Sequence, residues 1–458
     1  MSHRLSYSFD DELCDVVKRY EQFLSGTAAG YFDVEELADI IEYYLQRGRT
    51  KDCMKVLELG AQLHPNSSEL QVKRAKTFLA IGDNQSALLL LDSLAEKDDY
   101  EAVLLRSDVL TRLGRRKEAL ILCDRLLTHD TNQTDNICLD IANVFSAQSD
   151  FKTALLWLKK GDVFNPKNTD LLFDLAFCYE QENDYKKAIE TYDRILDIDP
   201  YFGEAWFNLG QVYFVQQDFS KALEAYSFVL TIDETDVLAC LQKAHTYFQL
   251  DRFEEAIETY IEYNQLTNDE SHTNLFIAEC YEKKERYIEA ISYYLLSLEM
   301  HPDNYDALIG IGICLLELER YDESIDYFRN ALALHEDASD AWVYLAEALI
   351  GLNENDDALT AYKRSLQIDP NQADTLMAAA NLYLEKGEYE TALQHYLSAQ
   401  RQDEGLEFLQ LFIAVCYFKM GDETKGMSHL QKAMAQNNEA KNLFLEICPE
   451  YDGTEFGF

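Results

Sequence analysis

The chain has 458 residues, and its 83 acidic residues outnumber its 40 basic residues, which gives a formal net charge of −43 at pH 7. So large a negative charge repels nucleic acid and anionic lipid, so we expect neither as a partner. The ten cysteines occur singly, without the paired spacing of a metal site or a redox motif. They indicate buried thiols in a reducing, cytoplasmic compartment.

The N-terminal part, residues 1–33, is predicted to contain one amphipathic helix, Phe9–Leu24, which caps the helices after it. The first residues, MSHRLSYSFDDELCD, lack the apolar segment of a secretory signal. The longest apolar run, LIGIGICLL from Leu308, is too short to span a membrane.

Prolines then mark a regular interval along the chain. Pro166, Pro200, Pro302 and Pro370 are separated by 34, 102 and 68 residues, which are multiples of 34. Because proline is tolerated only at the edge of a helix, it marks the end of each copy of a repeated unit. Such a period is typical of stacked helical repeats, and it overrides the three ordinary domains that the length suggests.

If the proline is counted as position 32 of a 34-residue repeat, the chain divides into consecutive repeats. Residues 34–134 form three irregular repeats that start at 34, 68 and 100, and residues 135–440 form nine regular repeats of 34 residues. Each repeat has two apolar-periodic segments joined by a polar turn, which predicts an antiparallel pair of helices, A and B. Residues 441–458 are predicted to form a short capping helix around LFLEIC and a tail, and the polar stretch 128–136 is predicted to be a pivot.

Small and aromatic side chains occupy fixed positions of the repeat. Position 20 is small in all twelve repeats, and position 8 is Ala, Gly or Ser in eleven, with Ile41 the exception. Tyrosine recurs at positions 11 and 24. Small residues let two helix backbones approach closely while large residues fill the neighbouring grooves.

With this period, these small and aromatic positions and the terminal proline, residues 34–440 resemble the tetratricopeptide repeat (TPR) family. The resemblance implies an all-α, right-handed superhelix of about twelve helix pairs, with the A helices on its concave side. It also implies a non-enzymatic scaffold or adaptor that binds other proteins. Glu234, Asn268, Glu336, Glu404 and Asn438 depart from the pattern because they replace the proline.

Positions 5, 9 and 12 of the A helices are then expected to face the concave groove, and most of them are apolar. An apolar second face on a helix needs a cover, which is either a bound polypeptide or the neighbouring repeats of a tightly wound superhelix. The candidate peptide-binding residues are Phe173, Phe177, Phe207, Gln211, Phe214, Leu241, His245, Phe248, Glu279, Ile313, Glu347 and Asn381.

The charges near this face predict the character of the partner. Acidic residues at position 2, namely Asp170, Glu204, Asp306, Asp340 and Asp374, form a rim that favours a partner with apolar anchors and basic flanks. Position 5 is never Lys, so the carboxylate clamp of some TPR co-chaperones is not expected. A basic cluster in the irregular repeats is a second candidate docking site, or a set of solvated helix faces: Lys73, Arg74, Lys76, Arg112, Arg115, Arg116 and Lys117.

No pattern of residues indicates catalysis, a cofactor or a metal. The glycines of GIGIC, residues 310–314, lie inside an A helix, where close helix packing explains them. Two alternatives to an adaptor remain open. The chain could form a homodimer through the groove, the terminal repeats or the tail EFGF (455–458), or it could be a regulatory TPR subunit of an enzyme complex.

Overall fold

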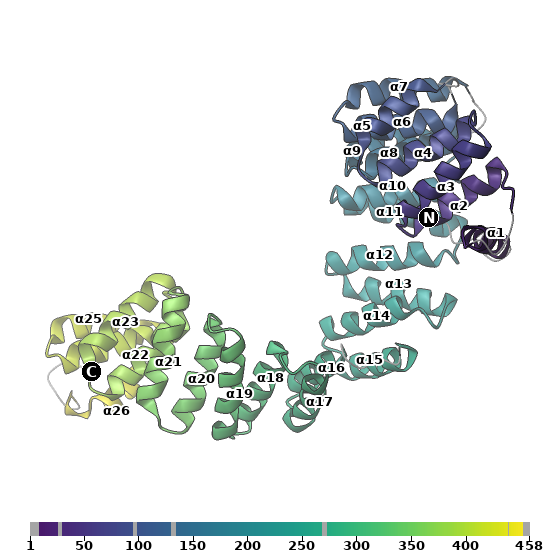
Figure 1. The fold of residues 1–458 in the computed structure, drawn as a ribbon. Coiled ribbons are helices and arrows are strands. Elements are labelled where there is room, and N and C mark those ends of the chain that lie inside the picture. The colour runs from purple at the N-terminus through teal and green to yellow at the C-terminus, as the bar shows by residue number, and fades with distance from the viewer. Residues whose placement is uncertain are drawn as a thin grey trace. The chain divides into compact units, whose positions relative to one another are not determined.

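The computed structural model describes residues 9–25, 30–94, 99–129, 134–267, 273–437 and 439–451, and within them the chain is helical, without a strand (Figure 1). The helices form the twelve predicted pairs. The A helices are α2 (Val34–Gln46), α4 (Ser68–Ala80), α6 (Tyr100–Arg112), α8 (Thr134–Ser146), α10 (Thr169–Gln181), α12 (Gly203–Val215), α14 (Val237–Gln249), α16 (Thr273–Lys283), α18 (Tyr305–Glu317), α20 (Ser339–Gly351), α22 (Ala373–Glu385) and α24 (Leu409–Lys419). The B helices are α3 (Thr50–Leu63), α5 (Asn84–Ser93), α7 (Arg116–His129), α9 (Phe151–Phe164), α11 (Tyr185–Ile198), α13 (Phe219–Ile232), α15 (Phe253–Thr267), α17 (Tyr287–Met300), α19 (Tyr321–Leu334), α21 (Asn355–Ile368), α23 (Tyr389–Gln402) and α25 (Glu423–Gln436).

Both predicted terminal helices are present. Helix α1 (Phe9–Leu24) has the predicted bounds, and α26 (Ala440–Ile447) is followed by a single 3-10 turn, η1 (Pro449–Tyr451). Tyr20 of α1 packs on Phe32 and Tyr44, and Phe444 of α26 packs on Phe418. The two end helices therefore cover the apolar faces of the first and last repeats. The tail 455–458 lies outside the described residues.

The turn between helices A and B has the same backbone conformation in every repeat. Position 15 has a positive φ in all twelve: it is glycine in five, such as Gly82 at φ 83°, and another residue in seven, such as Glu285 at φ 58°. This left-handed conformation ends helix A and turns the chain back on itself. The polar breaks in the sequence predicted these turns, but the seven residues that adopt the conformation without being glycine do so at a cost.

The small positions lie where helices A and B meet. The position 8 and position 20 residues are buried in all twelve repeats. A Cβ added to Gly312 would lie 2.3 Å from the ring of Phe328, and one added to Gly210 would lie 2.7 Å from the ring of Tyr226. The aromatic ring at position 24 therefore lies directly against the backbone of helix A, as the pattern of small and large residues predicted.

The helices form two compact units, Met1–Glu234 and Thr235–Phe458, each a stack of helix pairs in chain order (Figure 1). The expected pivot at 128–136 lies within the first unit, and its residues 130–133 are outside the described residues. One apolar core joins residues on both sides of it, from Val103 to Val212. The first unit therefore continues across this stretch. The division of the repeats at residue 134 stays a prediction.

None of the described helices combines the length and the apolar character that crossing a lipid bilayer requires.

Candidate functional site on the A helices

In the first unit, the predicted groove phenylalanines lie on α10 and α12 and pack mainly on other aromatic rings. Phe173 is half-buried, with its ring centre 6.1 Å from Tyr192 and 5.6 Å from Phe202. Phe177 is 40% exposed and lies edge-on to Phe151 at 6.0 Å. The face is thus partly covered by the protein itself and still presents apolar surface.

The neighbouring helix α12 continues this arrangement. Phe207 packs on Tyr226 with ring centres 5.8 Å apart, and Phe214 packs on Phe219 at 5.3 Å. Gln211, between them on the same helix, is exposed. Phe207 and Phe214 are each half-buried. Aromatic residues of the chain itself therefore cover part of this apolar face.

In the second unit, the predicted site begins on α14 with Leu241, His245 and Phe248, all half-buried. The Nδ1 atom of His245 is 2.7 Å from the hydroxyl of Tyr260, and its ring lies edge-on to Phe276 at 4.8 Å. Burial lowers the pKa of His245, which favours the neutral imidazole that can accept this hydrogen bond. His245 is therefore an internally bonded member of the face.

The remaining predicted residues lie on successive A helices of the same unit. Glu279 on α16, Ile313 on α18 and Asn381 on α22 are half-buried, and Glu347 on α20 is exposed. Asn381 accepts a 2.5 Å hydrogen bond from the hydroxyl of Tyr396. The structure thus places each of these side chains on the A helices but does not gather them into one compact pocket.

The sequence reasoning missed a recurring contact of the position 24 tyrosines. Four of these buried residues, Tyr192, Tyr260, Tyr294 and Tyr396, direct their hydroxyls to a polar side chain at position 9 or 12 of the same repeat. Tyr294 donates to Glu282 at 2.6 Å, and Tyr192 donates to Glu180. The paired residues are 12 or 15 positions apart in the sequence. A tyrosine at position 24 together with a polar residue at position 9 or 12 could therefore have predicted these hydrogen bonds.

Glu279 and Glu282 on α16 are half-buried, and Asp306 at the start of α18 is exposed. Burial raises the pKa of Glu279 to about 7, and the negative charges of Glu282 and Asp306 contribute to this rise. The largest cause is the loss of water around the charged form, and like charges add to it. These three residues, hereafter the Glu279 cluster, therefore give this part of the A-helix face a negative charge that a cation would stabilise.

The basic cluster of the N-terminal repeats is largely neutralised within the protein. Lys73 pairs with Glu42 at 3.6 Å and with Glu101 at 3.0 Å. Four others also pair with carboxylates: Lys76 with Glu42 (2.8 Å), Arg112 with Asp108 (2.9 Å), Arg115 with Glu118 (2.7 Å) and Arg116 with Asp150 (3.0 Å). Arg74 lies over the ring of Phe78. Five of the seven basic residues are thus paired with carboxylates, whereas Lys117 on α7 is exposed, and the docking role stays a prediction.

Among the described residues, no three His, Cys, Asp or Glu side chains come close enough to hold a metal ion. The nine cysteines whose side chains the structure describes are buried free thiols. Burial raises the pKa of each, for example that of Cys123 to about 11, so they remain protonated and unreactive at neutral pH.

The fold defines an α-helical repeat protein, and its A helices present partly exposed side chains. A family model described as tetratricopeptide repeat matches residues 72–135. The model for anaphase-promoting complex, cyclosome, subunit 3 matches residues 112–195 and 181–263. The model for the C-terminal domain of cilia and flagella-associated protein 70 matches residues 227–443. The chain belongs to the tetratricopeptide repeat family, whose repeats act in protein–protein interaction.

Among solved structures, the chain is similar to the crystal structure of the APC/C hetero-tetramer Cut9-Hcn1. The identity is 16%, the match covers 89% of this chain and 94% of that one, and the TM-score is 0.40. Two crystal structures of MamA match over 41% and 36% of this chain and 98% and 97% of theirs, at 18% and 19% identity and TM-scores of 0.35 and 0.34. No curated protein matches the chain.

Proposed function

We propose that the chain is a non-enzymatic scaffold whose A helices bind a segment of another protein that has apolar anchors and basic flanks. The Glu279 cluster is the observation that carries this proposal. Glu279 and Glu282 are half-buried on α16, and Asp306 is exposed at the start of α18. Burial, together with the negative charges of Glu282 and Asp306, raises the pKa of Glu279. A Lys or Arg side chain from a partner would restore a favourable charge interaction there.

Apolar surface beside this cluster supports the same partner chemistry. Ile313 and Leu316 on α18 and Val343 and Ile350 on α20 are half-buried residues at positions 5, 9 and 12. They come after the cluster along the second unit. A segment that places a basic residue at the cluster and apolar residues beyond it would match both features. The buried thiols suit a reducing, cytoplasmic location, which we also propose.

Affinity purification from the native cell extract tests the proposal. We expect the Glu279→Gln and Glu282→Gln double variant to lose its main partners, and binding of the wild-type chain to weaken as salt is raised. Glu299→Gln on α17 is the matched control, because Glu299 is exposed on a B helix. Partner profiles that are the same for the double variant and the wild type would contradict the proposal.

A second candidate function is that of a subunit in a larger protein assembly. The match of residues 112–195 and 181–263 to the model for a subunit of the anaphase-promoting complex favours it. The native molecular mass distinguishes an assembly subunit, an adaptor and a homodimer. An assembly subunit elutes from size-exclusion chromatography with other chains at a fixed ratio, whereas an adaptor exchanges its partners. A homodimer forms from the purified chain alone.

A further inference from the structure

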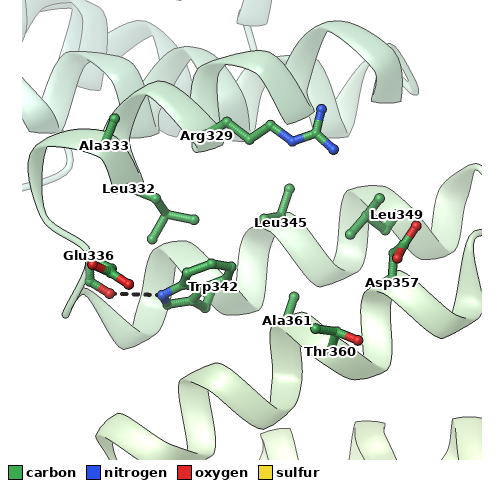
Figure 2. A pocket seen from close by; sticks show the side chains of 10 residues that line it. All are labelled: Arg329, Leu332, Ala333, Glu336, Trp342, Leu345, Leu349, Asp357, Thr360 and Ala361. Atoms are coloured by element: carbon green, nitrogen blue, oxygen red, sulfur yellow. Dashed lines mark hydrogen bonds between the residues drawn. The ribbon is translucent and has the colours of Figure 1, made fainter.

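A tryptophan on α20, Trp342, lies in a cleft between the two B helices that flank it (Figure 2). The cleft has a volume of about 500 Å³, and a second cavity of about 250 Å³ also includes Trp342. The lining of the larger cavity is mostly apolar, and Figure 2 shows side chains that line it: Leu332 and Ala333 from α19, Trp342 and Leu345 from α20, and Thr360 and Ala361 from α21.

In another repeat of the same chain, the equivalent tryptophan is stacked against an aromatic ring. Trp206 occupies the same repeat position as Trp342, and both indoles donate a hydrogen bond to a backbone carbonyl before helix A, to Pro200 at 2.9 Å and to Glu336 at 3.0 Å. Phe228 of α13 stacks on Trp206, with ring centres 4.4 Å apart and 15° between the planes.

At the repeat position of Phe228, helix α21 has Arg364. No aromatic ring among the described residues stacks on Trp342, and the guanidinium of Arg364 donates to Gln367 at 3.4 Å. The face on which Phe228 stacks in one repeat therefore has no ring of the described residues on it in the other.

We propose that this cleft, the Trp342 cleft, binds an aromatic side chain of a partner polypeptide, which stacks on Trp342 as Phe228 stacks on Trp206. Stacked rings attract each other beyond the effect of the buried area, and a deep aromatic anchor is the usual centre of a protein interface. The Trp342 cleft lies between B helices, so it is a second surface that does not depend on the A-helix face.

The charged residues around the cleft indicate which residues should flank the aromatic side chain in the bound segment. Arg329 and Arg364 are outnumbered by Glu336, Asp337 and Asp357, so the lining of the two cavities has a net charge of −1. The chain as a whole also has a strong negative charge. A segment whose aromatic residue has basic neighbours complements this surface, and one with acidic neighbours is repelled.

Fluorine NMR of the full chain labelled with 5-fluorotryptophan tests the proposal directly. The chain has three tryptophans, and Trp342→Phe assigns the relevant signal. The probes are the acetylated, amidated tripeptides Lys-Phe-Lys, Lys-Leu-Lys and Glu-Phe-Glu. We expect Lys-Phe-Lys to shift the Trp342 signal saturably and to bind about twofold to tenfold more tightly than Lys-Leu-Lys. Glu-Phe-Glu should bind more weakly than Lys-Phe-Lys, and the Trp206 signal should not respond.

Two variants exchange the residues at the repeat position that Phe228 and Arg364 share. Arg364→Phe supplies the missing ring from within, so the response of Trp342 should disappear. Phe228→Arg uncovers Trp206, so its signal should begin to respond even if Arg364→Phe fails to fold. Trp342 responses that are equal for Lys-Phe-Lys and Lys-Leu-Lys, or unchanged in a folded Arg364→Phe variant, would overturn the proposal.

A random dodecapeptide display selection against the full chain, with counter-selection on the Arg364→Phe variant, extends the test to polypeptides. We expect the recovered peptides to share an aromatic residue with basic neighbours. Recovered peptides without an aromatic residue would refute the proposed occupant. So would light scattering that shows a homodimer of the wild type which Arg364→Phe dissociates, because the occupant would then be a second copy of the chain.

Discussion

Replacing Glu279 with glutamine should change how the stability of the second unit depends on pH. The pKa of Glu279 is raised from 4.5 to about 7 in the folded chain, mainly by burial. Between these values the folded state binds more protons than the unfolded state, so stability falls as the pH rises. The difference of about 2.5 pKa units corresponds to about 3 kcal/mol, an upper bound because Glu279 keeps part of its surface in water. This penalty is complete above pH 7 and absent below pH 4.5.

Hydrogen exchange of peptides from α16, corrected for the intrinsic effect of pH, measures the local free energy of opening. Glu279→Gln should protect α16 more than the wild type does at pH 8, and the two proteins should converge towards pH 5. Glu299→Gln removes one exposed negative charge from the adjacent α17 and serves as the control. If the variant and the wild type differ by the same amount at pH 5 and pH 8, the reasoning about Glu279 is wrong.

Three further substitutions probe packing and backbone, and a fourth serves as a control. Tyr294→Phe should lower the free energy of unfolding by about 1–3 kcal/mol in urea, because it leaves a half-buried carboxylate without its 2.6 Å donor. Tyr226→Phe, the control, should cost almost nothing in the same assay, since the buried Tyr226 hydroxyl has no hydrogen-bond partner among the described residues. Glu285→Gly should raise thermal stability by up to about 1 kcal/mol, because φ is 58° there, and a lower melting temperature would contradict this. Gly312→Ala should destabilise by about 1–3 kcal/mol, partly offset by about 1 kcal/mol of helix propensity, because the new methyl group meets Phe328 at 2.3 Å.

The repeat pattern of the sequence predicted the helix pairs and their packing because these depend on the spacing of residue types along the chain. The small residue at position 20 is buried in every repeat, and Phe9–Leu24 forms the predicted helix. These features arise from the periodicity of apolar residues and from the need to bring two helices close together.

The candidate site was predictable only in part. The sequence placed Phe173 and Phe207 on the A helices, but it did not reveal that each packs on a buried tyrosine. Their exposure depends on rings that come from other helices and on the rotamers those rings adopt. The same holds for Lys73, whose two carboxylate partners lie on the preceding and following repeats.

The sequence by itself therefore determined the period, the helix pairs and the protein family, because a periodic pattern specifies local structure and the face that each helix buries. Only the tertiary structure decided which polar groups meet and where surface stays open. The carboxylates of the Glu279 cluster come from two repeats, and the Trp342 cleft exists because α21 has an arginine where α13 has a phenylalanine. Such features arise from contacts between side chains far apart in the sequence, which spacing along a single chain does not specify.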